Sequence, residues 1–294
     1  MSFNYKKAKS ICLFVGGIGL SLSYAAGCGL IDSSSDYDIC DGSSDLRLVY
    51  KGVGTGLMSS EDRLMNEHGY DFLMIDGECN YWSYETSGYM APVVSGSLTE
   101  EQAAAISADL SVNDWVNYDD DFYQQPEYAH ASVHVFWSPD SSFSCSADCT
   151  RWFGNQDATE IRENARQWLQ ELNESGESNP QAFRIMVIEA PHELHFDAPP
   201  VPVGFDLQSY VFSEEEYGRY CEGDSHYVTG EVAVELARLR EDFINGMYGS
   251  GRFGIAMEDE DGKVYEVYLR DALPQEDENG LIRVLNEHDV QCPQ

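Results

Sequence analysis

The chain has few basic residues. Lys and Arg together number 17, against 52 Asp and Glu, and the formal net charge of the 294 residues is −35. Such a surface repels the phosphates of nucleic acids and of anionic lipid headgroups, so the composition excludes a nucleic-acid partner. The scarcity of lysine runs through the whole chain. This favours general solubility in salty surroundings over one localised calcium site as the reason for the acidity.

Common catalytic and cofactor-binding motifs are also missing. The chain has no Gly-x-Ser-x-Gly motif, no phosphate-binding loop and no dinucleotide-binding glycine pattern. His192 and His195 flank Glu193, but nearby prolines oppose the helix that a His-Glu-x-x-His zinc site needs. The acidic stretches 36–45 and 258–263 lack the spacing of a helix-loop-helix calcium site. The sequence therefore assigns no catalytic, cofactor-binding or metal-ligating residue, and it leaves open whether the protein is an enzyme.

The apolar run at residues 11–22 is too short to span a bilayer, which takes about 20 residues. Lys6, Lys7 and Lys9 precede the run, and small residues at 25–27 follow it. A basic start, an apolar middle and a small-residue end are the three parts of a secretory signal. Cys28 comes directly after the small residues.

The order Ala25-Ala26-Gly27-Cys28 resembles the signal of bacterial lipoproteins, although that family more often has Leu where this chain has Ala25. The resemblance implies that residues 1–27 are a signal peptide and that Cys28 carries a diacylglycerol, with an amine often acylated by a chain such as palmitate. Two or three such chains hold a protein stably at a membrane. An ordinary cleaved signal and an uncleaved anchor helix are the alternatives.

This resemblance predicts the location. We expect a lipid-anchored protein of the bacterial cell envelope, whose membrane partner is reached through the lipid on Cys28. Gly29 favours the outer membrane over the inner one by the sorting rule of enteric bacteria.

The remaining chain is predicted to form a tether and one domain. Residues 28–45 are rich in Ser and Asp, which predicts a flexible tether after the acylated cysteine. Residues 46–294 are then the globular domain. Four prolines between positions 191 and 202 indicate either a subdomain break near 191–205 or a long loop on a single domain.

Six of the 8 cysteines remain after Cys12 leaves with the signal and Cys28 receives lipid. An even number in an exported chain predicts disulfides, here among Cys40, Cys79, Cys145, Cys149, Cys221 and Cys292. Six cysteines allow 15 pairings, which sequence alone does not distinguish. Cys145 and Cys149 are close enough for a local bridge, which we favour over a zinc site because no second pair lies at finger-like spacing. Thioredoxin-like redox motifs have two intervening residues, whereas this pair has three.

Hydrophobic periodicity predicts an α+β fold with a mixed or antiparallel sheet, several amphipathic helices and stabilising disulfides. Thr99 and Gln102 have the spacing of a capping box at the start of one helix. Helices are expected at 99–110, 157–172 and 228–249, with a short one at 60–68. Strands are expected at 46–53, 70–76, 89–96, 131–137 and 182–190, and a hairpin at 252–257 and 263–273.

Two classes of function follow. The first is a non-catalytic envelope lipoprotein that binds a partner or supports the envelope. The second is an envelope hydrolase, with or without metal assistance, whose histidines and acids are brought together by the fold. Convergence of three of His130, His134, His192, His195 and His226 with an acid would favour the enzyme. The aromatic stretch 79–85 is either a stacking platform for a ligand or part of the core, and the core is the commoner use.

The large negative charge predicts that the stability of the fold depends on salt concentration. Loss of the three signal lysines leaves 14 basic against 52 acidic residues, a net charge near −38. Compact packing of that charge stores repulsion, and salt shortens the screening length from about 30 Å at 0.01 M to about 3 Å at 1 M. We expect the melting temperature to rise with NaCl and equally with KCl, and only slightly further with calcium. Melting that is flat in NaCl but rises steeply with millimolar calcium would instead indicate a specific calcium site.

Overall fold

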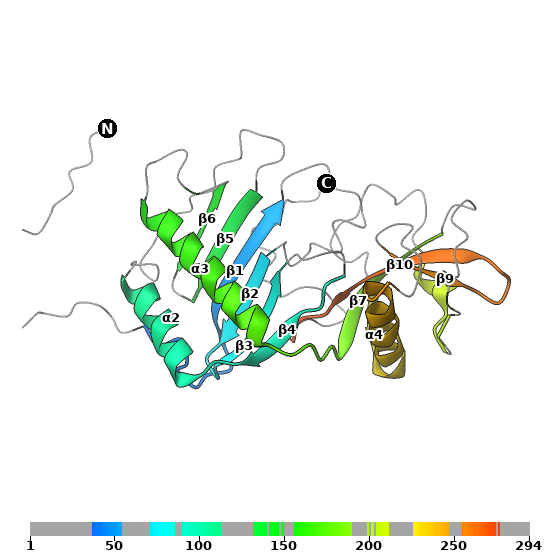
Figure 1. Ribbon diagram of the computed structural model, residues 1–294, viewed down its shortest axis with the longest axis horizontal. Helices are drawn as coiled ribbons and strands as arrows, with labels where there is room; N and C mark the ends of the chain where they lie inside the picture. The colour runs from blue at the N-terminus through cyan, green and yellow to red at the C-terminus, as the bar shows by residue number, and fades with distance from the viewer. Residues whose placement is uncertain are drawn as a thin grey trace, which may run out of the picture. The chain divides into compact units, whose positions relative to one another are not determined.

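The fold contains two antiparallel sheets and three helices within the part of the chain that is described (Figure 1). The structure is a computed structural model, and it describes residues 37–54, 71–85, 90–112, 132–139, 141–146, 149, 156–189, 199, 201–202, 204–211, 226–246, 254–274 and 276. The predicted α+β class is confirmed, and every strand pairing between named strands is antiparallel.

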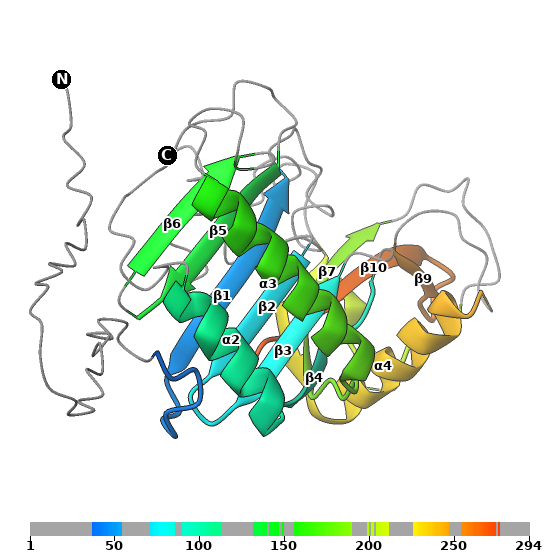
Figure 2. The ribbon, with the colours of Figure 1, turned by 60° about the vertical axis from the view of Figure 1, so that its left-hand side comes forward.

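The first sheet, here called sheet A, has six strands in the order β4-β3-β2-β1-β5-β6. These are β1 Leu46–Gly54, β2 Asp71–Asp76, β3 Asn80–Glu85, β4 Val94–Ser97, β5 Ser132–Ser138 and β6 Ser141–Ser146. Helices α2 (Glu100–Val112) and α3 (Gln156–Ser175) lie across one face of it (Figures 1 and 2).

Alternate residues of sheet A bury their side chains beneath these two helices. Each large aliphatic side chain buried in this way stabilises the fold by about 1.5–3 kcal/mol. The cluster includes Leu48, Tyr50, Leu73, Ile75, Tyr81 and Phe136 from the strands and Ile106, Leu110, Ile161, Trp168, Leu169 and Leu172 from the helices.

A bulge in β1 changes which face of the sheet the side chains at the start of the strand point to. Leu46 pairs with Asp76 and Leu48 with Ile75, so Arg47 is an extra residue with no paired residue on β2. The bulge turns Leu46 to the opposite face from Leu48, where it joins Val49 in a second buried cluster. A one-residue shift therefore decides which core each leucine enters.

The second sheet, sheet B, has the order β8-β7-β10-β9. Its strands are β7 Ala182–Glu189, β8 His226–Thr229, β9 Ile255–Glu258 and β10 Val264–Asp271, and the 3₁₀ turn η2 (Leu207–Tyr210) and helix α4 (Gly230–Ile244) contact them. The predicted hairpin is present as β9 and β10, and its turn places Gly262 at φ +79°, where a side chain is strained. Helix α4 buries Ala233, Leu236 and Leu239 in the core of this sheet.

Asp271, at the end of β10, joins the two sheets. Its Oδ2 accepts a hydrogen bond of 2.6 Å from the backbone N–H of Val93, just before β4, and its Oδ1 lies 2.7 Å from a guanidinium nitrogen of Arg240 on α4. Burial raises the pKa of this carboxyl and Arg240 lowers it. Leu273, two residues on, packs with Val93 in the second cluster of sheet A. One short segment thus contacts both sheets.

A second buried ion network lies on the opposite face of sheet B. Arg184 and Arg270 are cross-strand neighbours on β7 and β10, and both contact the carboxylate of Glu276. Arg270 donates two hydrogen bonds, of 2.8 and 2.7 Å, and Arg184 donates one of 3.3 Å. The side chain of Glu276 is 0% exposed. A single carboxylate therefore separates two like charges that would otherwise repel one another at close range.

Residues 37–45, the end of the expected tether, belong to the folded domain. Tyr37 and Ile39 are 7% and 0% exposed in the core of sheet A. Their backbone N–H groups donate to Ser111 and Ser107 on α2, at 3.2 and 3.1 Å. Four residues of helix rise about 6 Å and two residues of extended chain about 6.6 Å, so the two spacings match. The folded domain begins by Tyr37, and residues 28–36 lie outside the described part.

The remaining predicted elements agree with the structure in part. Thr99 and Gln102 form the expected reciprocal capping box, with distances of 2.9 and 3.2 Å. The strand expected at 89–96 is limited to β4, and the helix expected from 228 begins at Gly230 because Val228 and Thr229 end β8. The helix expected at 60–68 and most of the proline-rich stretch 191–205 lie outside the described residues.

Replacing the buried carboxylate gives a test of this packing. Glu276→Gln should lower the free energy of unfolding by about 3–5 kcal/mol, because Arg184 and Arg270 lose the charge that compensates them. Glu235→Gln is the matched control, since that glutamate is 41% exposed in its ion pair with Arg238 and should cost at most about 1 kcal/mol. Urea denaturation of both variants measures the difference. Equal effects would mean that Glu276 does not neutralise the pair.

Candidate functional site

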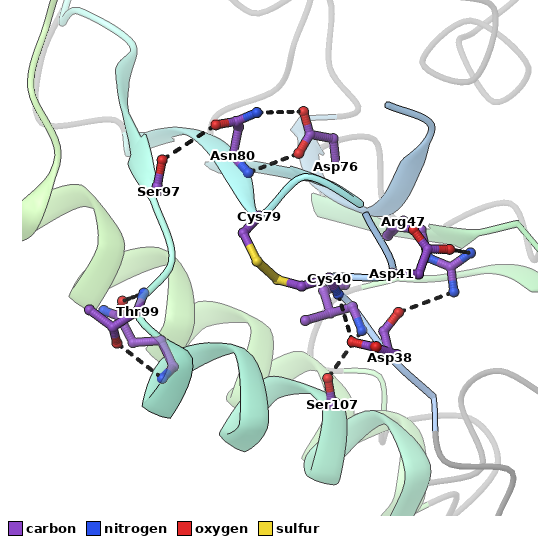
Figure 3. The surroundings of a disulfide bond; sticks show 12 residues. Asp38, Cys40, Asp41, Arg47, Asp76, Cys79, Asn80, Ser97, Thr99 and Ser107 are labelled. Carbon is purple, nitrogen blue, oxygen red and sulfur yellow. Dashed lines mark hydrogen bonds and ion pairs between the residues drawn. A yellow bond between two sulfur atoms is a disulfide. The ribbon is translucent and has the colours of Figure 1, made fainter. Parts of the chain in front are cut away.

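Cys40 and Cys79 form a disulfide that fixes the start of the domain to the turn between β2 and β3 (Figure 3). In that turn the Asp76 carboxylate accepts hydrogen bonds from the backbone and side-chain nitrogens of Asn80, at 2.8 and 3.0 Å. A Cβ on Gly77 would lie 2.2 Å from the Asp41 carboxylate, so only glycine fits there. These contacts describe a structural crosslink.

Arg47, the residue in the β1 bulge, completes this crosslinked corner. Its guanidinium lies 3.1 Å from the Asp41 carboxylate and donates to the carbonyl of Asp38 at 3.2 Å (Figure 3). The same group lies 4.8 Å from the centre of the Tyr37 ring. The Asp38, Asp41 and Asp76 side chains therefore have defined hydrogen-bond or ion-pair partners within the fold.

Cys145 and Cys149 form the second disulfide, which is the local bridge expected from their spacing. Cys145 lies on β6, the last strand in the order of sheet A, and is 9% exposed on the face that α2 and α3 cover. Cys149 is partly buried against the same core and has a backbone φ of +59°, which is strained for a residue with a side chain.

The strand register places this disulfide at the end of a row of chemically active residues. Across β3, β2, β1, β5 and β6, consecutive pairings align Glu85, Asp71, Gly52, His134 and Cys145 on the helix-covered face of sheet A. We call these five residues the polar row. Neighbouring strands lie about 4.8 Å apart, so the row spans about 19 Å. It brings two carboxyls, an imidazole and a disulfide onto one line.

His134 lies nearly in the core, at 7% exposure, and bonds to Tyr50 in the adjacent position of β1. The Tyr50 hydroxyl and Nδ1 of His134 are 3.0 Å apart, and their rings are parallel to within 4° with centroids 5.9 Å apart. Gly52 leaves room beside the imidazole: a Cβ there would lie 3.6 Å from Nδ1. Burial, and then the charge of Asp71, raise the pKa of Tyr50, so the tyrosine stays a neutral hydroxyl.

The carboxyl end of the polar row lies close to α3. Asp71 and Glu85 are like-charged cross-strand neighbours, and Arg166 of α3 lies 3.9 Å from Asp71. Burial raises the pKa of Asp71, Arg166 lowers it and Glu85 raises it further. Along the same helix, the Tyr81 hydroxyl donates to the carbonyl of Leu172 at 3.2 Å. The helix is thus joined to the sheet by polar contacts at its middle and near its C-terminal end.

The polar row combines groups that transfer protons with a disulfide. A carboxyl with a raised pKa and an imidazole with a fixed Nδ1 partner are general acid–base groups. The sulfur of Cys145 is bonded in the disulfide, so it is an electrophile for an attacking thiolate and is not itself a nucleophile. Its chemistry therefore favours sulfur exchange over attack on an ester or peptide.

The histidines expected to converge are only partly described. His134 lies in sheet A, and His226 begins β8 of sheet B, where its ring meets the ring of Tyr210 at 4.9 Å. His130, His192 and His195 lie outside the described residues, as do Cys28, Cys221 and Cys292. Among the residues that are described, no group of three or more His, Cys, Asp or Glu could hold a metal ion.

The aromatic stretch 79–85 fills the two cores of sheet A. Tyr81 is buried beneath the helices, whereas Tyr84 is buried in the cluster on the other face and Trp82 packs against that cluster. The alternation of β3 explains this division, since successive side chains point to opposite faces. Of the two interpretations of this stretch, the structure favours core packing over a ligand platform.

Sequence reasoning named His134 and Cys145 separately but did not connect them, and it missed Tyr50, Asp71 and Arg166. These residues come from strands far apart in the chain, and only the strand register aligns them. The one local signal was Gly52 within the strand, since a glycine inside a strand is typical of a close approach by another group.

No protein-family model and no curated protein sequence matches this chain. Within the described residues, none of the helices is both long and apolar enough to cross a membrane.

The two disulfides should differ in their effect on stability. The Cys40–Cys79 bridge joins residues 39 apart and the Cys145–Cys149 bridge residues only 4 apart. Restriction of the unfolded chain is then worth about 4 kcal/mol for the first and about 2 kcal/mol for the second. Double serine variants of each pair should show this order in urea denaturation. A larger loss from the short bridge would contradict the assignment of the long one as the main structural crosslink.

Non-reducing peptide mapping checks the pairing itself. It should recover Cys40–Cys79 and Cys145–Cys149, and the expectation of three bridges leaves Cys221 and Cys292 as the third pair. Alkylation of several of these six cysteines without prior reduction would contradict it.

Proposed function

We propose that this protein is a lipid-anchored lipoprotein of the bacterial cell envelope and that its domain is a non-catalytic binding or envelope-associated module. The observation that carries the proposal is the lipoprotein-like order Ala25-Ala26-Gly27-Cys28 followed closely by a disulfide-bonded domain. Structural disulfides persist in oxidising, extracytoplasmic compartments, so they support export of the chain.

The short distance from Cys28 to the domain supports an anchoring role. Residues 29–36 separate the cysteine from Tyr37, the first residue that is described. Nine steps of fully extended chain reach at most about 30 Å. A lipid on Cys28 would therefore hold the domain within about one domain diameter of the bilayer.

The charge of the domain makes such an anchor necessary for membrane attachment. Without the three signal lysines, a net charge near −38 is repelled by anionic headgroups and supplies no attraction to them. The affinity would then come entirely from buried acyl chains, at about 0.8 kcal/mol per methylene. This argument favours covalent lipid over a peripheral, electrostatic association.

The non-catalytic part of the proposal rests on how the described polar groups are used. Asp271, Glu276 and Asp76 each accept hydrogen bonds from partners within the fold. These groups contribute to folding, and a binding or supporting role does not require them to be free.

Acyl labelling tests the anchor. Cells that express the full chain are grown with a labelled palmitate, and we expect label on the wild-type protein and none on Cys28→Ser. The same variant should keep its signal peptide, because the lipoprotein peptidase cuts only after the cysteine is modified. Incorporation and cleavage are measured in preference to membrane fractionation, since an uncleaved apolar segment would itself retain the protein at the membrane.

Cys12→Ser is the matched control, because Cys12 lies within the apolar run of the same signal. This variant should be labelled and cleaved like the wild type. Label that persists in Cys28→Ser, or that disappears in Cys12→Ser alone, would refute lipidation at Cys28.

A further inference from the structure

We propose that the Cys145–Cys149 disulfide is a thiol–disulfide exchange site that reacts with an external dithiol, and that His134 assists the departure of the Cys145 sulfur. This activity is separate from the anchor and does not rest on it. Three observations carry it: the position of the two sulfurs, the backbone at Cys149, and the residue opposite Cys145.

The position of the disulfide allows reduction without loss of the fold. The bridge closes a short loop, with residues 4 apart, so it restricts the unfolded chain little. The pairing of β5 with β6 runs from Ser138 and Ser141 to Val133 and Ser146, so most of it lies on the side of Cys145 away from the loop that the bridge closes. This disulfide contributes less to folding than the long one and lies at a defined position in the sheet. Both properties suit a bond that is broken and re-formed in a reaction.

The backbone at Cys149 is strained while the bridge is closed. Its φ of +59° lies in the left-handed region, which disfavours residues with a Cβ. Cys79 also has a positive φ, of 68°, but there the turn itself holds the residue, through its N–H bonded to Asp76 and its carbonyl bonded to Leu98. Opening the bridge frees the chain at Cys149 to relax.

His134 lies directly opposite Cys145 across β5 and β6. Opposed residues on one face of an antiparallel pair have Cβ atoms about 4.5–5.5 Å apart, so the two side chains leave the sheet from neighbouring positions on the same face. A positively charged imidazole stabilises a neighbouring thiolate. Among the described residues, Tyr50 on β1 bonds to His134, and the charges that act on Tyr50 in turn are Asp71 on β2 and, from α3, Arg162 and Arg166.

The exchange then proceeds in two balanced steps. A thiolate of the dithiol attacks Sγ of Cys149, which is the more exposed of the two, and the Cys149–Cys145 bond breaks. Cys145 leaves as a thiolate and takes a proton from the His134 imidazolium. The second thiol of the dithiol attacks the mixed disulfide and gives its proton to His134, and Cys149 leaves as a thiolate that takes a proton from water. The dithiol loses two electrons to form a disulfide, and the protein gains two thiols.

Graded reduction tests the site. The full chain, purified in detergent, is treated with increasing dithiothreitol, and free thiols are alkylated and located by mass spectrometry. We expect Cys145 and Cys149 to react together at a concentration at least about tenfold below that needed for Cys40 and Cys79, with the circular dichroism unchanged. Simultaneous reduction of both bridges, or earlier reduction of Cys40–Cys79, would overturn the proposal.

The pH profile tests the role of His134. After correction for the thiolate fraction of dithiothreitol, the rate of reduction in the wild type should rise about threefold from about pH 8 to about pH 6, as the imidazolium forms and the leaving thiol becomes more acidic. His134→Gln should remove this rise. His226→Gln, the described histidine in sheet B, should keep it. A rise that survives in His134→Gln would refute the role of His134. The graded reduction of the two bridges tests the exchange site itself and needs no variant.

Discussion

The Asp271 carboxylate holds the two sheets in one fold. It accepts the Val93 N–H ahead of β4 and the Arg240 guanidinium from α4, in a place where water is excluded. Burial raises the pKa of this carboxyl, whereas Arg240, the backbone donor of Val93 and the charge of Arg270 lower it. Because Leu273 follows two residues later and enters the core of sheet A, the geometry of this one side chain determines how β10 leaves sheet B and how the far face of sheet A is packed.

Glu276 extends the same constraint to the opposite face of sheet B. An isolated pair of arginines on neighbouring strands would repel strongly in the core, and the carboxylate that separates them comes from the segment after β10. Besides its two guanidinium partners, it accepts the Leu273 N–H at 2.7 Å. The turn after β10 is thus fixed at both of its ends by buried acids, Asp271 and Glu276. Buried ion pairs add little net stability, but removing one partner is costly, so such a network specifies one arrangement of the chain.

Much of this architecture could be predicted from the sequence, and the failures have physical causes. β1, β2 and β7 are rich in apolar residues, and the Thr99–Gln102 box is purely local, so both were predictable. The strand β6, with sequence SSFSCS, was missed because serine carries little strand preference and its partner β5 supplies the pairing. Residues 37–45 were expected to be tether because Ser and Asp dominate there. Tyr37, Ile39 and Cys40 nevertheless find partners on α2 and in the β2–β3 turn, which no local pattern reveals. The polar row was unpredictable for the same reason, since it exists only through the register of five strands.

The start of the domain has a mechanical consequence if Cys28 carries lipid. A pull on the tether reaches Tyr37 first, where the serine hydroxyls of Ser107 and Ser111 hold the chain by two hydrogen bonds. Those bonds are weak, each worth about 1 kcal/mol net. Three residues further, the covalent Cys40–Cys79 bridge passes the load to the β2–β3 turn, and from there into the centre of sheet A. The load therefore bypasses β1, which is the next strand in sequence and pairs with both β2 and β5. A long-range disulfide at this point protects the central strand from the anchor, whereas the short bridge at Cys145 carries no such load and is free to take part in exchange.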